Sequence, residues 1–180
     1  MTAGGPLAGR IAIVTGAGGG IGRDTCVSLA RAGAIPVLVG RDASRLAASA
    51  AAVAEAGVTA PLTLSLDVRV ESDMAGMAAA TLERHGRIDI LVHAAGILRA
   101  AGATLRTVAQ LSCPEWDEVV DTNLRGTYFA NRAVLPEMLR AGRGDILNVS
   151  SKSGRQGIAF DAPYCASTSS CVPNNPRTTS

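Results

Sequence analysis

The sequence predicts an α/β fold in which parallel strands and helices alternate to build a doubly wound sheet. Short apolar runs alternate with longer, alanine-rich segments of helical period, a pattern typical of repeated β-α units. Each apolar run is hydrophobic along its whole length, as expected for strands that are covered on both faces. The chain has 180 residues, 47% of them hydrophobic, so it fits one domain with an ordinary core.

The expected elements follow one another along the chain. The strands are predicted at 11–15, 36–39, 62–66, 88–93 and 146–149, and the helices at 21–32, 44–56, 71–84, 112–121 and 124–140. Ser112 and Glu115, with Pro114 between them, predict a capped helix start. Gly142 and Gly144 predict the end of the helix that follows. The sequence therefore indicates one parallel sheet of about five strands.

The end of the chain has a different texture. Residues 168–180 contain two prolines and adjacent asparagines and show no apolar period. Such a segment does not readily continue the helix that begins near Tyr164, so we expect a disordered tail. The folded domain is accordingly expected to span residues 1–167.

Composition argues against several classes of protein. The 17 basic and 15 acidic residues are scattered without runs, which disfavours nucleic acid and anionic lipid as partners. No stretch approaches the roughly 18 apolar residues of a membrane span, and the first residues lack the apolar core of a signal peptide, so we expect a cytoplasmic protein. The four cysteines show neither CxxC nor paired-histidine spacing, which disfavours a metal site or a disulfide framework.

A glycine-rich turn, TGAGGGIG at 15–22, joins the first strand to the first helix. Residues without a Cβ let backbone N–H groups approach a pyrophosphate at the positive end of that helix. Such glycines can also serve turn geometry alone, but their place in the first β-α unit favours dinucleotide binding, and no Gly-Lys-Ser/Thr follows to indicate a nucleotide triphosphatase. The candidate contacts are Thr15, Gly16, Gly18, Gly20, Ile21 and Gly22.

The ends of the next strands indicate which dinucleotide binds. An acid after the second strand suits the ribose 2′-OH of NAD, whereas an arginine suits the 2′-phosphate of NADP. Arg41 is the first residue after that strand, so we expect NADP(H), with NAD as the alternative because Asp42 could turn inward and repel the phosphate. Asp67 and Val68, after the third strand, are expected either to contact the adenine or to cap the next helix.

The fourth strand ends in the sequence HAAG at 93–96. The small residues Ala94, Ala95 and Gly96 would let the backbone run close to the cofactor. His93 lies in an apolar strand, so a hydrogen-bonded structural histidine is favoured over a catalytic one.

The motifs TGAGGGIG, HAAG, NLRG, NVSS and YCAS, in this order and spacing, resemble the short-chain dehydrogenase/reductase family over about residues 10–167. Each motif is weak alone, but the ordered set is specific. The resemblance implies a Rossmann-type, NAD(P)-dependent oxidoreductase that acts on a small-molecule alcohol or ketone and is usually a homo-oligomer.

The resemblance also implies roles for three residues. Ser151 would donate a hydrogen bond to the substrate carbonyl, and Tyr164 would protonate that oxygen as hydride arrives from the nicotinamide. Asn123 would hold a helix bend and a water that relays protons. Ser150 is the alternative to Ser151, which we prefer for its spacing from Tyr164.

Thr168 departs from the family pattern, which has a lysine four residues after the tyrosine. A phenol with a pKa of about 10 is only one part in a thousand ionised near pH 7, and the lysine charge corrects this. Lys152 is a weak candidate for a stand-in. We therefore expect impaired turnover in a truncated chain whose fifth strand is an exposed edge. The alternatives are a non-catalytic nucleotide-binding or interaction fragment, and a chain that does not fold stably.

Overall fold

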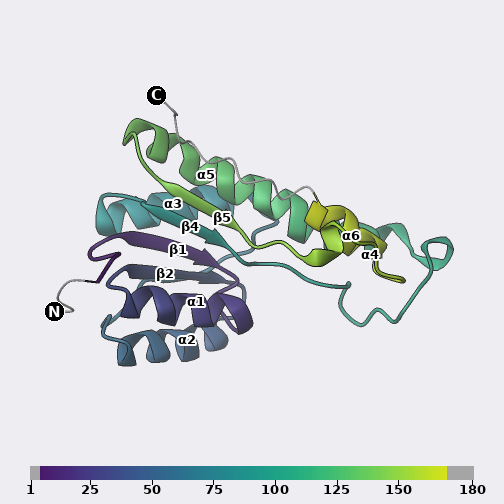
Figure 1. Cartoon of the computed structure of the whole chain (residues 1–180), viewed down its shortest axis with the longest axis horizontal. Coiled ribbons are helices and arrows are strands. Elements are labelled where there is room, and N and C mark those ends of the chain that lie inside the picture. The colour runs from purple at the N-terminus through teal and green to yellow at the C-terminus, as the bar shows by residue number, and fades with distance from the viewer. Residues whose placement is uncertain (1–4, 170–180) are drawn as a thin grey trace.

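The computed structural model describes residues 5–169 and contains a five-stranded parallel sheet with helices on both faces (Figure 1). The strand order is β3-β2-β1-β4-β5, which confirms the predicted α/β class and the doubly wound topology. The strands are β1 (Ile11–Thr15), β2 (Ile35–Gly40), β3 (Thr63–Ser65), β4 (Ile90–His93) and β5 (Asp145–Asn148).

Within residues 5–169, six α-helices and three shorter helical segments lie between or after these strands. The α-helices are α1 (Gly20–Arg31), α2 (Ala43–Glu55), α3 (Glu71–His85), α4 (Cys113–Val120), α5 (Gly126–Arg140) and α6 (Ala162–Ser169). The short segments are the 3₁₀ helices η1 (Val108–Gln110) and η3 (Lys152–Gly154) and the π-helix η2 (Asp121–Arg125).

Two apolar layers lie on opposite faces of the sheet because successive strand residues point to opposite sides. In β1, Ile11 and Ile13 contact the layer that holds α3 and α5, whereas Ala12 and Val14 contact the layer that holds α1 and α2. Figure 1 shows these two helix layers above and below the sheet. The central strands are fully buried, as their unbroken apolar runs predict.

β5 is the exposed edge strand that the sequence analysis expects, and it is not covered on both faces as its apolar run alone would indicate. Only Ile146 is buried, while Leu147 is 53% exposed. The strand lies at the edge of the sheet and pairs only with β4 among the described strands, so one of its faces stays open. The apolar run 146–149 could not distinguish an edge strand from a central one.

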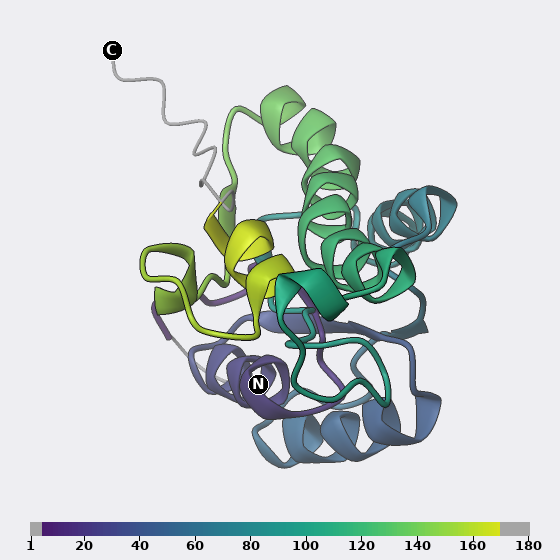
Figure 2. The same ribbon diagram turned by 90° about the vertical axis from the view of Figure 1, so that its right-hand side faces the viewer.

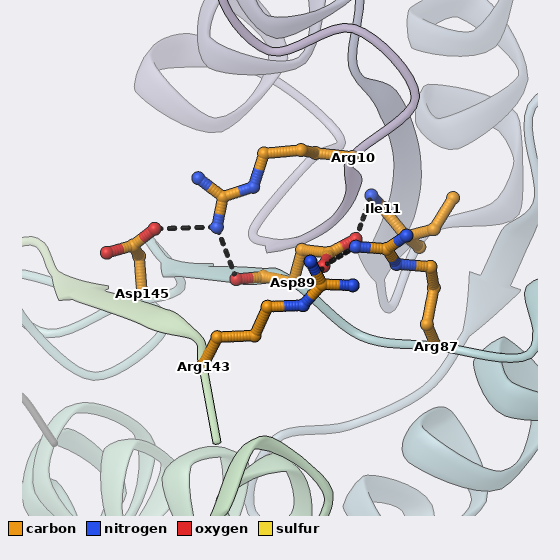
Figure 3. Close-up of polar contacts among 6 residues, drawn as sticks. All are labelled: Arg10, Ile11, Arg87, Asp89, Arg143 and Asp145. Atoms are coloured by element: carbon orange, nitrogen blue, oxygen red, sulfur yellow. Dashed lines mark hydrogen bonds and ion pairs between the residues drawn. The ribbon is translucent and has the colours of Figure 1, made fainter. Parts of the chain in front are cut away.

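A buried carboxylate fixes the amino-terminal ends of the strands (Figure 3). Asp89 accepts a hydrogen bond of 2.9 Å from the backbone N–H of Ile11 and forms an ion pair with Arg87. Arg10 bridges to β5 by donating to the Asp89 carbonyl at 3.0 Å and to the Asp145 carboxylate at 2.6 Å. This cluster lies at the end of the sheet opposite to the glycine turn, and its role is structural.

The helix boundaries agree with the sequence, with two exceptions. The capping box of Ser112 and Glu115 is present at the start of α4. The two separate helices expected at 112–121 and 124–140 are instead continuous, because the π-helix η2 joins α4 directly to α5. Thr168 and Ser169 belong to α6, so the predicted tail begins two residues too early. The rest of that tail, 170–180, lies outside the described residues.

Candidate functional site

A cavity of about 380 Å³ lies at the carboxyl ends of the central strands, where the strand order reverses. The glycine turn, the residues after β2, β3 and β4, and one residue of η2 surround it. The lining residues are Gly16, Gly18, Gly19, Gly20, Gly40, Arg41, Asp42, Arg45, Leu66, Asp67, Val68, Ala95, Gly96, Ile97 and Thr122.

The glycine turn has a geometry that requires glycine at two positions. Gly16 has a φ of 71°, and a Cβ there would lie 2.8 Å from the backbone nitrogen of Ala95. A Cβ on Gly22 would lie 2.3 Å from the carbonyl oxygen of Gly16. Space above Gly19 and Gly20 is open, because a Cβ on either would meet no atom within 4 Å. The turn therefore folds tightly and leaves a bare backbone beside the start of α1, which suits a pyrophosphate.

Asp42 acts as the N-cap of α2. Its carboxylate accepts hydrogen bonds from the Ser44 hydroxyl at 2.7 Å and from the backbone N–H groups of Ser44 and Arg45 at 2.9 and 3.0 Å. The Ser44 hydroxyl bond, followed by the Arg45 N–H bond, lowers the pKa of Asp42. In this arrangement the Asp42 carboxylate is bonded to the start of α2 and does not turn inward toward the place of a phosphate.

Two arginines line the same end of the cavity. Arg41 is exposed directly after β2, as expected. Arg45 lies over the glycine turn, since its Cβ is 3.2 Å from the position that a Cβ on Gly18 would take. Sequence reasoning missed Arg45, which lies in the first turn of α2, soon after the strand end that carries Arg41.

Asp67 lines the cavity, and its carboxylate is shared with Arg69. The guanidinium of Arg69 donates to both carboxylate oxygens, with a shortest contact of 2.6 Å, and this holds the pKa of Asp67 below its usual range. The N-cap of α3 is Val70, so the alternative that Asp67 caps this helix is wrong. Asp67 therefore remains the candidate contact for the adenine.

His93 is a structural residue at the end of β4. Its Nδ1 lies 2.9 Å from the Thr15 hydroxyl, which also accepts the backbone N–H of Ala95 at 3.3 Å. Because that hydroxyl accepts from Ala95, its own hydrogen is available for Nδ1. Burial lowers the pKa of His93 to about 4, so the imidazole is neutral near pH 7. The pair fixes the HAAG segment against the glycine turn, with Ala95 and Gly96 facing the cavity.

Asn123 lies within the π-helix η2, between α4 and α5. Its Nδ2 donates to the Ile97 carbonyl at 2.9 Å, and its Oδ1 accepts the Ile97 N–H at 2.8 Å. The same Nδ2 lies 3.1 Å from the Ser167 hydroxyl on α6. Asn123 thus joins three segments that are distant in sequence: η2, the loop after β4 and α6.

The two serines after β5 have different partners. Ser150 donates its hydroxyl to the Thr168 carbonyl at 2.7 Å, so it anchors this loop to α6. The Ser151 hydroxyl lies 3.1 Å from that of Ser153 and accepts the backbone N–H of Ser153 at 3.2 Å. Ser150 is thus tied to α6, whereas the contacts of the Ser151 hydroxyl stay within its own loop.

Tyr164 is the third residue of α6, which lies beside α4 at the carboxyl end of the sheet (Figure 2). Thr168 follows one turn later, and its hydroxyl donates to the Tyr164 carbonyl at 2.8 Å. The Thr168 side chain carries no charge, and its hydroxyl is bonded to the helix backbone. The residue is 7% exposed. Lys152 is exposed on η3.

The structure gathers most of the predicted nucleotide contacts around the cavity but not all of them. Ile21 is 64% exposed and does not line it, and neither does Thr15, which is buried and bonded to His93. Gly22 and Ala94 do not line it either and act through backbone packing. Ile97 and Thr122 were not predicted, because the loop after β4 has no periodicity and the π-helix has no sequence signal that we recognised.

Fold and site together define a doubly wound α/β protein with a glycine-lined cavity where the strand order reverses. Residues 10–171 match the family model described as short chain dehydrogenase. The chain belongs to this family, as its motifs predict.

Known relatives agree with this assignment. Levodione reductase of Leifsonia aquatica is 38% identical over 158 residues, which cover 87% of this chain and 58% of that protein. The 3beta-hydroxysteroid dehydrogenase of Mediterraneibacter gnavus is 37% identical over 171 residues, covering 93% and 60%. The crystal structure of actinorhodin polyketide ketoreductase with NADPH has a TM-score of 0.82 at 35% identity, covering 89% of this chain and 60% of that one.

The chain thus spans about three fifths of the length of the relatives described. Within residues 5–169, no helix is both long enough and apolar enough to cross a membrane.

Proposed function

We propose that the chain is an oxidoreductase that transfers hydride between NADP(H) and a small-molecule ketone or secondary alcohol in the cytoplasm. The observation that carries this proposal is the cavity at the glycine turn. Tight backbone contacts at Gly16 and Gly22 shape it, and Arg41 and Arg45 line one end of it. These features fit the pyrophosphate and the 2′-phosphate of NADP(H), respectively.

The commitment of Asp42 to α2 supports NADP(H) over NAD. A carboxylate facing the ribose would accept the 2′-OH of NAD and repel a 2′-phosphate. Here the carboxylate accepts three bonds at the start of α2, and the neighbouring side chains are cationic. Asp67, Val68, Ala95 and Gly96 complete the proposed nucleotide contacts.

Ser151, Tyr164 and Asn123 are the proposed groups on the reacting side. When bound, the nicotinamide supplies the hydride that reaches the carbonyl carbon. Ser151 donates a hydrogen bond to the carbonyl oxygen, and Tyr164 delivers the proton to it. Asn123 keeps α6 and the loop after β4 in place through its bonds to Ser167 and Ile97.

A second candidate function is nucleotide binding without turnover. Thr168 favours it, because the hydroxyl that replaces the expected ammonium donates to the Tyr164 carbonyl and carries no charge. Both functions use the same cavity, and they differ in whether Tyr164 can transfer the proton that turnover requires.

Two measurements separate these functions. Nicotinamide fluorescence during a titration of the purified chain with NADPH reports binding. The loss of NADPH absorbance in the presence of a panel of ketones reports turnover. Binding together with turnover supports the oxidoreductase. Binding without turnover for every ketone supports the second function. A folded chain that binds neither NADPH nor NADH contradicts both.

A further inference from the structure

Asp161 is a buried acid that lies directly before α6 and has no role in the site described above. Its side chain is only 6% exposed, and a carboxylate at that depth needs a cationic partner. The partner is Arg99, whose guanidinium nitrogen lies 2.7 Å from Oδ1 in an ion pair rather than a well-directed hydrogen bond. Arg99 lies on the loop after β4, three residues beyond the HAAG segment, so the pair joins two distant parts of the chain.

The same residue also begins the helix that carries Tyr164. The carbonyl of Asp161 accepts the backbone N–H of Cys165 at 2.9 Å, which closes the first turn of α6 around Tyr164. The side chain of Asp161 thus fixes the helix to the loop after β4, while its backbone starts the helix. A displacement of Asp161 would move the first turn and Tyr164 with it.

The backbone before Asp161 is held in an unfavourable conformation. Phe160 has a φ of 66°, in the left-handed region that non-glycine residues rarely adopt. Its side chain is 49% exposed, so burial of the phenyl ring does not explain this conformation. A strained backbone conformation of this kind persists where neighbouring contacts hold it in place. The ion pair of Arg99 with the buried Asp161 is such a contact, directly after Phe160.

A second anchor lies at the other end of α6. Asn123 contacts Ser167 there, and it also holds Ile97 through two hydrogen bonds. Ile97 lies two residues before Arg99, so both anchors lead back to the loop that passes the nucleotide cavity. Tyr164 lies midway between Asp161 and Ser167.

We propose that Arg99 and Asp161 are positioning residues that set Tyr164 relative to the nucleotide cavity. This inference rests on the proposed function, since it assigns Tyr164 the role of proton donor. The two residues act through α6 and touch neither the substrate nor the cofactor. Breaking the pair should therefore misplace the phenol and leave the cavity intact.

The variants Asp161→Asn and Arg99→Gln break the ion pair from its buried and its more exposed side, and Arg99→Lys keeps the charge. Arg106→Gln is the matched control, because the Arg106–Glu115 ion pair of 2.8 Å joins the same loop to α4 rather than to α6. Hydrogen exchange read by mass spectrometry reports on residues 158–169 and on the rest of the chain. Steady-state kinetics with NADPH and a ketone supplies kcat and KM.

We expect exchange in residues 162–169 to rise by about tenfold or more in Asp161→Asn and Arg99→Gln, with little change elsewhere. Under the same conditions kcat should fall by at least about tenfold while NADPH affinity stays within about twofold. Arg99→Lys should recover most of both losses, and Arg106→Gln should show neither.

Faster exchange across the whole domain with a normal kcat per folded molecule would mean that the pair only stabilises the fold, and would overturn the inference. Unchanged exchange in α6 would overturn it as well. If the unsubstituted chain neither binds NADPH nor turns over, the proposed function fails, while the exchange comparison still decides whether the pair positions α6.

Discussion

In the proposed function, the side chain at position 168 decides how well Tyr164 can deliver a proton. Thr168 lies one turn beyond Tyr164 and supplies no charge. We predict that Thr168→Lys raises NADPH-dependent turnover by on the order of a hundredfold, since an ammonium there favours the ionised phenol. The full effect of lowering a phenol pKa by about three units would be about a thousandfold. Thr168→Met has a similar length without the charge and should leave the rate unchanged. An equal rise in both variants would refute the electrostatic explanation.

Arg41 is the residue that we propose to control the choice between the two coenzymes. A charge-assisted bond to the 2′-phosphate is worth roughly 1.5–3 kcal/mol, so Arg41→Gln should weaken NADPH binding by about tenfold or more. NADH lacks this phosphate, and its affinity should change by less than about twofold. Calorimetric titration of both coenzymes measures the ratio. Equal losses for NADPH and NADH would place the 2′-phosphate away from Arg41.

His93 predicts a loss of stability in acid. Its pKa is lowered to about 4 in the folded chain from 6.5, so the neutral form is favoured by folding. This contribution is complete above pH 6.5 and disappears as the pH falls toward 4; between pH 7 and pH 5 the loss is about 2 kcal/mol. In urea unfolding, His93→Asn should remove this part of the pH dependence. The more exposed His85, substituted by asparagine, is the control, and an unchanged acid slope in His93→Asn would contradict the assignment.

At the scale of elements, strands and helices with a strong period were predictable to within about two residues. Strands buried on both faces leave unbroken apolar runs, and helices leave a helical period in the sequence. β1 and α3 are examples. The π-helix at Asp121–Arg125 was not, since an inserted residue leaves the apolar spacing of a helix almost intact. The end of α6 was misjudged because Thr and Ser are poor helix formers by themselves, whereas Thr168 and Ser169 are helical and bond to carbonyls of the preceding turn.

The site followed the same rule. Residues in regular motifs, such as the glycines and Arg41, could be found from spacing. Ile97 could not, because its position depends on the amide of Asn123, which lies on a different element. The Arg99–Asp161 pair joins two irregular loops, and no local pattern connects them.

The amino-terminal end of the sheet depends on Asp89. Burial raises the pKa of this carboxyl, but the bonds from Arg87 and from the Ile11 N–H outweigh burial and lower it overall. Removing a partner from such a buried pair costs on the order of 3 kcal/mol, so Asp89→Ala should lower the free energy of unfolding by about that amount. Asp117→Ala, an exposed acid on α4, is the control in urea unfolding. A loss below about 1 kcal/mol would show that the cluster in Figure 3 is not needed for stability.

At the scale of the whole molecule, an apolar groove of about 670 Å³ runs along α1 and the open face of β5. Leu147, Leu29 and Val92 are among its lining residues. An edge strand with exposed apolar side chains favours association between chains. We therefore predict concentration-dependent self-association in sedimentation velocity, which Leu147→Lys should reduce. Leu105→Lys, at an exposed leucine on another face, should not, and a monomeric chain at all soluble concentrations would refute the prediction.

The central claim is that the glycine turn holds the pyrophosphate of NADP(H). The most direct test is a crystal structure of the chain soaked with NADPH. We predict density for the pyrophosphate over the backbone amides of residues 18–20, with the 2′-phosphate beside Arg41. Ordered NADPH at any other place, or a bare glycine turn at saturating coenzyme, would contradict the account.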